Sequence, residues 1–198
     1  MQTENGVPAP EAKSAPKKSL LQTIWEFAGF AVIAVLIVIP VRVFIAQPFI
    51  VSGSSMVPAF ENSDYLIVDE LSYRLDDPER FDVVIFKYPK DPNKYFIKRI
   101  IGLPGEEVDI KGNTITITNP EHKEGLVLEQ PFVKRPGDNN MHVELGQDEY
   151  FVMGDNRNAS SDSRYWGPVK RELIIGRAFL RLLPIGSIEV LPGNYSDN

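Results

Sequence analysis

The sequence predicts a mostly β domain that follows a single N-terminal transmembrane helix, and three observations lead to this prediction. One long apolar stretch contains no charged residue from Phe27 to Val41. Beyond it, short segments rich in Val, Ile, Phe, Tyr and Thr are separated by turn residues, which is the pattern of β-strands. Only residues 69–77, DELSYRLDD, are compatible with a brief helical turn.

Residues 20–46 are predicted to form the membrane anchor. The segment from Ile24 to Ile45 reaches the roughly 20 mostly apolar residues that a membrane-spanning helix needs. A cleaved signal peptide is one alternative, but its apolar core would be shorter, and Ile45-Ala46-Gln47 is a poor match to a small-x-small cleavage site. A buried core helix is the other alternative, and the absence of a polar stripe argues against it.

The N-terminal tail sets the predicted orientation. Residues 1–19 are rich in Pro, Ala, Lys and Glu and are predicted to be disordered. Lys13, Lys17 and Lys18 precede the apolar stretch, so the positive-inside rule places this tail in the cytoplasm. Residues 47–198 would then lie outside the cytoplasm, on a protein that crosses the plasma (inner) membrane once.

The composition excludes several classes of function. The chain has 198 residues, enough for one domain of ordinary size and an appendage. Its net charge of −6 argues against nucleic acid as a partner. The chain has no cysteine, which excludes disulfides, thiol catalysis and cysteine-based zinc sites. A Ser-His-Asp triad would have to use His122 or His142, because the sequence contains no other histidine.

Six segments beyond the anchor are predicted to be β-strands, and together they indicate a barrel-like or sandwich-like domain. Residues 103–114 are expected to form a turn, a strand and a tight Gly-Asn hairpin connection. Residues 120–147 are more polar and have a weaker pattern, so we expect a surface excursion made of loops. The six predicted strands are residues 64–71, 81–88, 94–103, 113–119, 149–155 and 176–185.

Lys98 lies within one of these predicted strands and is a candidate general base. Alternate residues of a strand share a face, so Lys98 would lie with Phe96 and Ile100, and Arg99 would point the other way. A lysine amine in an apolar pocket loses hydration of its charged form, which lowers its pKa. The neutral amine can then accept a proton near neutral pH. The alternative is a solvated lysine on an edge strand.

Residues 49–60, FIVSGSSMVPAF, place three serines and a glycine between large apolar residues. A serine needs a nearby base to become a nucleophile, and with no histidine in a persuasive setting a lysine is the available partner. Backbone amides of a glycine-containing turn can stabilise an oxyanion. The alternative is a plain flexible turn. A solvated turn does not need the apolar side chains that flank this one, which are Phe49, Val51, Met56 and Phe60.

Residues 153–169, MGDNRNASSDSRYWGPV, form a third polar segment. An ion pair between Asp162 and Arg164 would hold this loop rigid and make it a positioning device. The alternative is an ordinary surface loop. The acidic residues do not have the spacing of an EF-hand, so no metal site is predicted.

Together these segments resemble bacterial type I signal peptidases, the membrane-bound Ser-Lys endopeptidases. The motifs GSSMVP, DVVIFKYP, YFIKRIIGLPGE and GDNRNASSDSRYWG follow the apolar stretch in that order. The resemblance covers residues 20–184 and leaves the tail and residues 120–147 outside the family's motifs. It implies an antiparallel β-sheet catalytic domain on a single N-terminal transmembrane helix.

The resemblance also implies a role for individual residues. Ser55, directly before the methionine, matches the nucleophile, and Lys98, before the arginine of the KR pair, matches the general base. Ser160 matches a serine whose hydroxyl lies beside the lysine amine. Asp162 and Arg164 match a supporting ion pair.

Two positions depart from the family pattern. In some members a serine two residues before the nucleophile donates its hydroxyl to the oxyanion, and Gly53 occupies that position here. The oxyanion hole would then be the Ser55 amide and a second donor, which is either another backbone amide or the hydroxyl of Ser52 or Ser54. Ser63 stands where a glycine is commoner, a change expected to alter only a turn.

The expected substrates are signal peptides of exported preproteins, cut after small-x-small sites such as Ala-x-Ala. An extended substrate would add to exposed strand edges through main-chain hydrogen bonds, and the apolar surface near the anchor would rest on the lipid bilayer. By similarity, the walls of the shallow specificity pockets would include Phe49, Val51, Met56, Phe60, Leu66, Ile85, Phe96 and Ile97.

The expected mechanism proceeds through an acyl-enzyme and needs no cofactor. Neutral Lys98 takes the proton of Ser55, and Ser55 attacks the carbonyl before the scissile bond. Water activated by Lys98 then releases the peptide. Two alternatives remain at this point: a LexA-like Ser-Lys protein that cleaves itself, and an inactive anchored β-domain that only binds peptides.

Overall fold

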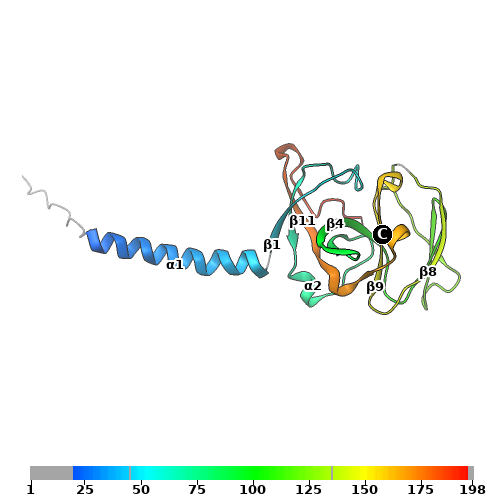
Figure 1. The fold of residues 1–198 in the computed structure, drawn as a ribbon, viewed down its shortest axis with the longest axis horizontal. Coiled ribbons are helices and arrows are strands. Elements are labelled where there is room, and N and C mark those ends of the chain that lie inside the picture. The colour runs from blue at the N-terminus through cyan, green and yellow to red at the C-terminus, as the bar shows by residue number, and fades with distance from the viewer. Residues whose placement is uncertain (1–19, 45, 135, 196–198) are drawn as a thin grey trace, which may run out of the picture. The chain divides into compact units, whose positions relative to one another are not determined.

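The computed structural model describes residues 20–44, 46–134 and 136–195 (Figure 1). The chain divides into two compact units, residues 1–40 and 41–198. The predicted disordered tail, residues 1–19, lies outside the described residues.

Helix α1 (Leu20–Phe44) occupies the predicted anchor. Its described apolar side chains are exposed, with Trp25 at 77% and Phe30 at 73% of their full exposure. Across the described part of the chain, we find no helix with both the length and the apolar character that crossing a membrane requires. The membrane span therefore stays a prediction from the sequence. The anchor was also predicted slightly too long, because Ala46 already belongs to a strand.

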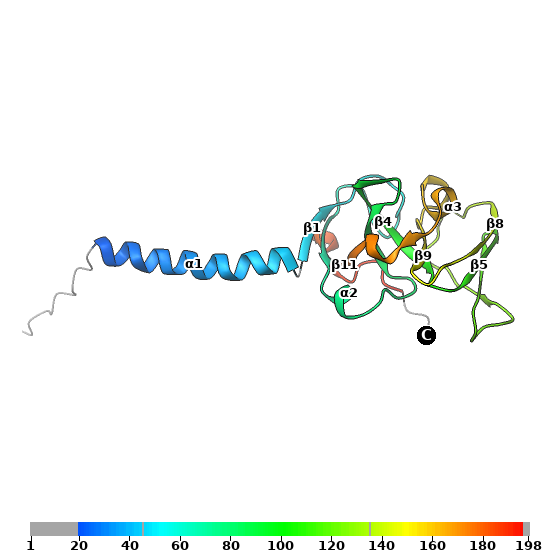
Figure 2. The same ribbon diagram turned by 60° about the horizontal axis from the view of Figure 1, so that its bottom comes forward.

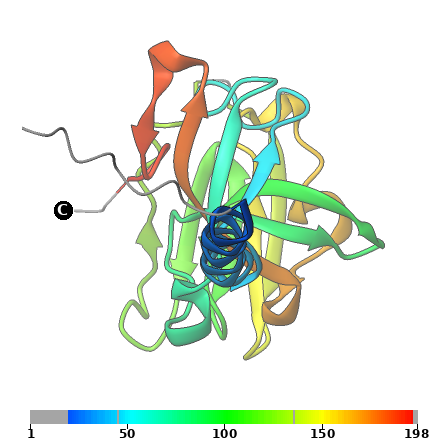
Figure 3. The ribbon, with the colours of Figure 1, turned by 90° about the vertical axis from the view of Figure 1, so that its left-hand side faces the viewer.

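The first sheet has eight strands, all antiparallel to their neighbours, in the order β1-β2-β11-β3-β4-β9-β10, with β12 paired to β11. Figure 3 shows part of this order, with the orange strand β11 beside the red strand β12. The strands are β1 (Ala46–Ile50), β2 (Tyr65–Asp69), β3 (Val83–Tyr88), β4 (Asp91–Gly102), β9 (Glu149–Met153), β10 (Val169–Lys170), β11 (Ile174–Leu183) and β12 (Glu189–Val190).

The second sheet has four strands in the order β7-β6-β5-β8. Figure 2 shows β5 beside β8. The hairpin between β5 and β6 turns at Gly112 and Asn113, as predicted, and Gly112 has a φ of 61°, which glycine adopts readily. The strands are β5 (Glu107–Gly112), β6 (Thr114–Thr118), β7 (Leu126–Val127) and β8 (Asn139–Glu144).

Residues 120–147, predicted as a surface excursion with loops, also contain two strands that the prediction did not include, β7 and β8. Strand β8 pairs with β5 along its whole length. Its alternation is weak because only Met141 and Val143 face the core, where they are partly buried against the cluster beneath the second sheet. Polar residues occupy the other positions of β8, so the period of two was hard to see in the sequence.

The six predicted strands are all present, and the predicted helical turn forms as α2 (Ser72–Leu75). The remaining short helices are α3 (Ser163–Trp166), η1 (Arg157–Ala159), η2 (Arg171–Leu173) and η3 (Ile185–Ser187). The fold class predicted for the domain, mostly β and antiparallel, is therefore confirmed.

Three clusters of buried apolar side chains support the two sheets. The first lies under the second sheet and includes Ile115 and Ile117. The second lies under β1, β2 and β3 and includes Phe60 and Leu66. The third packs under β3, β4 and β9 and includes Ile100. Burial of this kind contributes most of the favourable free energy of folding.

The second sheet should be an integral part of the core and not a dispensable excursion. Replacement of the fully buried Ile117 by alanine leaves a cavity, so we expect a loss of about 2–5 kcal/mol in the free energy of unfolding. Val127→Ala, at a position that is 59% exposed in the same sheet, is the control and should change stability by less than about 0.5 kcal/mol. Urea unfolding of the full chain in detergent measures both. Equal, small losses would contradict the assignment of this sheet to the core.

Candidate active site

An open groove with a volume of about 630 Å³ lies between β1, the serine-rich segment that follows it, and the outer half of β4. Ser55 and Lys98 both line it. The other lining residues are Phe49, Ile50, Val51, Ser52, Gly53, Ser54, Leu66, Ile85, Lys94, Tyr95, Phe96, Ile97, Ala159 and Ser161.

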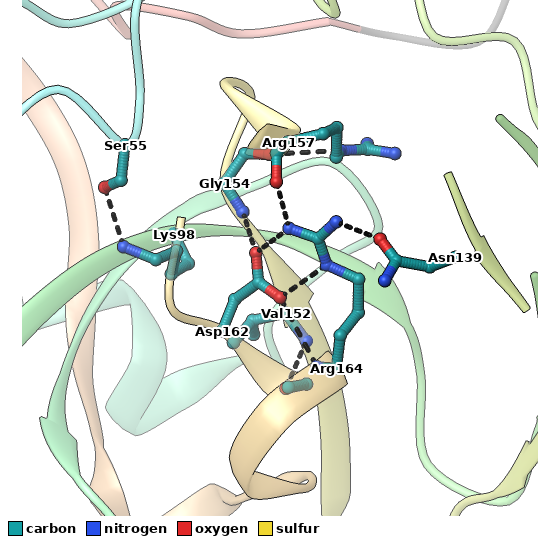
Figure 4. A network of polar contacts seen from close by, with 9 residues as sticks. Ser55, Lys98, Asn139, Val152, Gly154, Arg157, Asp162 and Arg164 are labelled. Carbon is teal, nitrogen blue, oxygen red and sulfur yellow. Dashed lines mark hydrogen bonds and ion pairs between the residues drawn. The ribbon is translucent and has the colours of Figure 1, made fainter. Parts of the chain in front are cut away.

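Lys98 and Ser55 are joined by a direct hydrogen bond (Figure 4). The Lys98 Nζ donates to Ser55 Oγ at 2.8 Å and to the carbonyl oxygen of Ile97 at 2.8 Å. Ser55 is half-buried, and Lys98 is only 4% exposed. The two residues are 43 positions apart in the sequence, so only the fold brings them together.

Burial controls the protonation of Lys98. Removal of the amine from water lowers the Lys98 pKa to about 8, although the nearby carboxylates of Asp162 and Asp155 act in the opposite direction. The Phe96 ring lies 5.4 Å from the Lys98 Nζ and covers part of it. At pH 7 about a tenth of this lysine is therefore neutral and able to accept a proton, and at pH 8 about half.

Arg99 corrects part of the strand argument. It does point away from Lys98, but it is buried more completely, with no exposed surface. Its guanidinium makes a two-pronged ion pair with Asp155, at 2.8 and 2.7 Å, which satisfies the buried charge. The strand alternation identified one buried cation, and this strand contains two, because Arg99 finds its partner carboxylate in a segment 56 residues away.

Asp162 and Arg164 form the ion pair expected from their spacing, and it is the centre of a larger network (Figure 4). Arg164 donates from Nε and Nη2 to the two carboxylate oxygens of Asp162, both at 2.8 Å. Asp162 also accepts from the Gly154 amide at 3.0 Å. Arg164 donates to the Arg157 carbonyl and, at 2.7 Å, to Asn139 of β8. The second sheet thus contributes directly to the support of this loop.

Ser160 is buried beside this network. Its Oγ has no hydrogen-bond partner among the described residues, and the Lys98 amine donates to Ser55 and to Ile97. Gly154 packs against it so closely that a Cβ there would overlap both Ser160 Oγ and the carbonyl oxygen of Ser55. The role expected for Ser160 beside the amine therefore stays a prediction.

The serine turn is held by Asn156, which the sequence analysis did not select. The Asn156 amide donates to the Ser55 carbonyl at 3.0 Å, and its side chain donates to the Ser54 carbonyl at 3.1 Å. Asn156 lies one residue after Asp155, so the buried ion pair of Arg99 also places this contact. The sequence signal that could have led to Asn156 is its position between Asp155 and Arg157 in the motif GDNRN.

Gly53 and Ser63 both adopt left-handed backbone conformations, with φ values of 99° and 73°. Glycine accepts this region without strain, whereas serine there is uncommon, which is a physical reason for the glycine that the family resemblance implies at position 63. The Gly53 amide donates to the Asn62 side chain at 2.9 Å. Because this amide already has a partner, the candidates for the second oxyanion donor are the exposed hydroxyls of Ser52 and Ser54 or another amide.

Six of the eight residues expected in the pocket walls line the groove, and two do not. Met56 and Phe60 are 1% and 0% exposed and pack in the core behind the groove. Tyr95 and Lys94 line the groove and were not predicted. Among the described strands, β9 pairs with β4 only from Arg99 onward, so the outer half of β4, which carries both residues, has a free edge on that side. Among the described residues, no group of three or more His, Asp or Glu side chains could hold a metal ion.

The buried amine should leave a signature in the pH dependence of stability. The Lys98 pKa is about 8 in the folded chain and 10.5 in the unfolded reference, so between these values only the unfolded chain holds the proton. Raising the pH across this window therefore favours the folded state, by ~1 kcal/mol per pH unit relative to Lys98→Met. Denaturant unfolding at pH 7 to 11 measures the difference.

Lys87→Met removes a lysine from an exposed position of β3 and controls for the substitution itself. A stability difference between wild type and Lys98→Met that stays level from pH 7 to 11 would contradict the lowered pKa.

Comparison with known proteins identifies the family to which the chain is similar. The family model described as "Signal peptidase, peptidase S26" matches residues 24–183. A probable signal peptidase I-2 of Synechocystis sp. is 39% identical over 90% of this chain and 82% of its own length. The signal peptidase I of Leptolyngbya laminosa is 35% identical over 95% and 94%. A crystal structure of a signal peptidase I from Enterococcus faecalis V583 is 29% identical, covers 52% of this chain and 97% of its own, and has a TM-score of 0.45.

Proposed function

Because the chain belongs to the signal peptidase family, peptidase S26, and is a serine endopeptidase, we propose that it cuts signal peptides from exported preproteins with a Ser55–Lys98 dyad. The observation that carries the proposal is the 2.8 Å hydrogen bond from a buried lysine amine to a serine hydroxyl at the edge of a groove. A serine hydroxyl becomes a nucleophile only when a base can take its proton, and Lys98 is in hydrogen-bond contact with it.

The proposed reaction has two stages. Neutral Lys98 takes the Ser55 proton as Ser55 Oγ attacks the scissile carbonyl, and the oxyanion is held by the Ser55 amide and a second donor. The ammonium of Lys98 then gives its proton to the departing amine, which leaves the signal peptide bound to Ser55 as an ester. Lys98, again neutral, takes a proton from water, and the resulting attack releases the peptide and regenerates Ser55.

The proposed substrate lies in the groove as an extended strand. In the described part of the sheet, β1 pairs only with β2, and the outer half of β4 lacks a neighbour on the side where β9 begins. Both segments line the groove, so main-chain groups at their edges are available to a peptide. Apolar walls from Val51, Leu66 and Ile97 favour small apolar side chains, which supports cleavage after Ala-x-Ala sites.

Asp162, Arg164 and Ser160 are proposed as supports for the dyad. The Asp162–Arg164 pair binds the amide of Gly154, against which both Ser160 and the Ser55 carbonyl pack. We propose that Ser160 Oγ, buried and without a partner among the described residues, accepts from the Lys98 amine during the reaction, when Ser55 is acylated.

Attachment to the plasma (inner) membrane is also a proposal. It rests on the uncharged stretch Phe27–Val41 and on the exposed apolar side chains of α1. The lysines that precede α1 in the sequence support a cytoplasmic N-terminus and an extracytoplasmic catalytic domain.

Cleavage should depend on both members of the dyad. The test uses the full chain in detergent with a preprotein that carries an Ala-x-Ala site. Ser55→Ala and Lys98→Ala should each lower kcat by about 10³-fold or more, because the nucleophile or its base is lost. Lys87→Ala is the control lysine, at an exposed position of β3.

Two further variants resolve the oxyanion donor. Ser52→Ala or Ser54→Ala should lower kcat by about 10²-fold if its hydroxyl is the second donor.

The proposed dyad is wrong if the wild-type protein leaves the preprotein uncut, or if Lys98→Ala cuts the preprotein as fast as wild type.

Acylation should rise with pH through the Lys98 pKa. Since only the neutral amine can take the Ser55 proton, kcat/KM should increase with a midpoint of about 8 and level off above it. At pH 6 the rate should be about a hundredfold below the plateau. Initial rates between pH 6 and 10 measure this profile, and a rate that is flat over that range would remove Lys98 from the role of base.

A further inference from the structure

The segment Leu191–Tyr195, far from the dyad in the sequence, lies against the residues that hold it. It follows β12 and makes a turn in which the Asn194 amide donates to the Leu191 carbonyl at 3.0 Å. The Leu191 amide is bound to the carbonyl of Phe179 in β11 at 2.7 Å. Pro192 within it is buried. The segment is therefore packed and hydrogen-bonded on both sides of Gly193.

Gly193 supplies a hydrogen-bond acceptor to the buried Arg99. The Arg99 Nη1 donates to the Gly193 carbonyl at 2.6 Å and to the Phe81 carbonyl at 2.9 Å, and its other two bonds go to Asp155. A guanidinium with no exposed surface needs partners for its N–H groups, because water cannot replace them. The Gly193 carbonyl is thus a further hydrogen-bond acceptor for Arg99. It comes from a different part of the chain than the other two partners, Asp155 and the Phe81 carbonyl.

Gly193 also touches the turn that carries the nucleophile. A Cβ at Gly193 would lie 3.0 Å from the Phe60 ring and 3.4 Å from both the Ala59 Cβ and the Arg99 Nη2. Phe60 closes the turn after Ser55, since its amide donates to the Met56 carbonyl at 2.9 Å. One residue therefore contacts the strand of Lys98, through Arg99, and the turn of Ser55, through Ala59 and Phe60.

Tyr195 anchors the other end of the segment. Its ring packs edge-on against Phe81 at 5.4 Å and Phe132 at 5.9 Å between centroids, and these two rings pack on each other at 5.6 Å. The Arg99 guanidinium lies 4.1 Å from the centre of the Phe132 ring. The aromatic cluster and the Gly193 carbonyl thus enclose Arg99 together.

We propose that the segment Leu191–Tyr195 is a positioning element of the active site, which holds Arg99 on Asp155 and fixes the turn of Ser55 relative to the strand of Lys98. The proposal rests on the Ser55–Lys98 dyad proposed above. It assigns to Gly193 and Tyr195 a function in catalysis although neither lines the groove.

The electrostatics of the site give this role a measurable consequence. Asp155 and Asp162 both raise the Lys98 pKa against the effect of burial, and each carboxylate is paired with an arginine. If Arg99 moves off Asp155, the uncompensated carboxylate stabilises the charged amine more strongly, so the Lys98 pKa rises. The charged groups of this cluster are Asp155, Asp162, Arg99, Arg157 and Arg164.

The test is Gly193→Ala in the full chain, with Gly112→Ala as a matched control. Both glycines have a positive φ, 71° and 61°, so alanine is strained at both. Only at Gly193 does the added methyl group meet a ring at 3.0 Å, whereas at Gly112 the nearest atom is 3.9 Å away. We expect Gly193→Ala to lower kcat by about ten- to a hundredfold with little change in KM, and to move the midpoint of kcat/KM to higher pH. Gly112→Ala should keep the wild-type midpoint.

Tyr195→Leu is a second variant that keeps an apolar side chain and removes the aromatic ring together with its hydroxyl, and it answers the question if Gly193→Ala does not fold. Thermal unfolding confirms that each variant is folded at the assay temperature. A shift of the midpoint to higher pH in a folded variant supports the proposal. A folded variant that keeps the wild-type midpoint, or loses no more activity than Gly112→Ala, overturns it. Failure of the dyad itself would appear separately, as cleavage by Ser55→Ala or Lys98→Ala.

Discussion

The structure of the site depends on one constraint, the burial of a lysine amine against a serine hydroxyl. An amine that loses its hydration has a lower pKa, so more of it is neutral and can accept a proton near neutral pH. Nearby negative charges oppose this effect because they stabilise the protonated amine. Two carboxylates, Asp155 and Asp162, lie close enough to Lys98 to do so. Each is bound by an arginine, Arg99 or Arg164, at 2.7 to 2.8 Å. The burial of the amine and the pairing of both carboxylates are therefore parts of a single requirement.

The arrangement of the two sheets follows from where strand β4 is paired and where it is not. Strand β4 pairs with β3 from Asp91 to Arg99 and with β9 from Arg99 to Gly102, so the two neighbours meet at Arg99. Arg99 and the residues after it in β4 are buried. Before Arg99 the edge of β4 on the β9 side has no partner among the described strands, and there β4 lines the groove. Lys98 stands at this boundary, with its backbone in a rigid sheet and its amine at the wall of an open groove. A strand that keeps its pairing with β3 but lacks β9 beside Lys98 would give the proposed base both precise placement and access to a peptide.

Sequence reasoning was sufficient where the evidence was local. Alternating apolar residues predicted the six strands, and ordered motifs led to Ser55 and Lys98 through a family resemblance. Sequence reasoning was insufficient where the position of a residue depends on a partner that is distant in the sequence. Arg99 is buried because Asp155, which follows the end of β9, pairs with it. The residues around Arg99 in the sequence contain no pattern that predicts this pairing. Met56 and Phe60 were expected in the groove by similarity to the family, but the turn directs both side chains into the core. Strand β8 was missed because its order comes from pairing with β5.

The buried ion pairs near Lys98 have a structural role that burial of the amine alone does not require. Buried ion pairs are weak contributors to stability, and apolar residues of similar volume often stabilise as well or better. If the site needed only to remove water from Lys98, apolar side chains would serve. The paired groups instead bind the main chain: Asp162 holds the Gly154 amide, Arg164 the Arg157 carbonyl, and Arg99 the carbonyls of Phe81 and Gly193. Charge-assisted bonds of this kind fix backbone segments in direction as well as distance. We infer that the role of these pairs is to fix the segments that meet at Ser55 and Lys98.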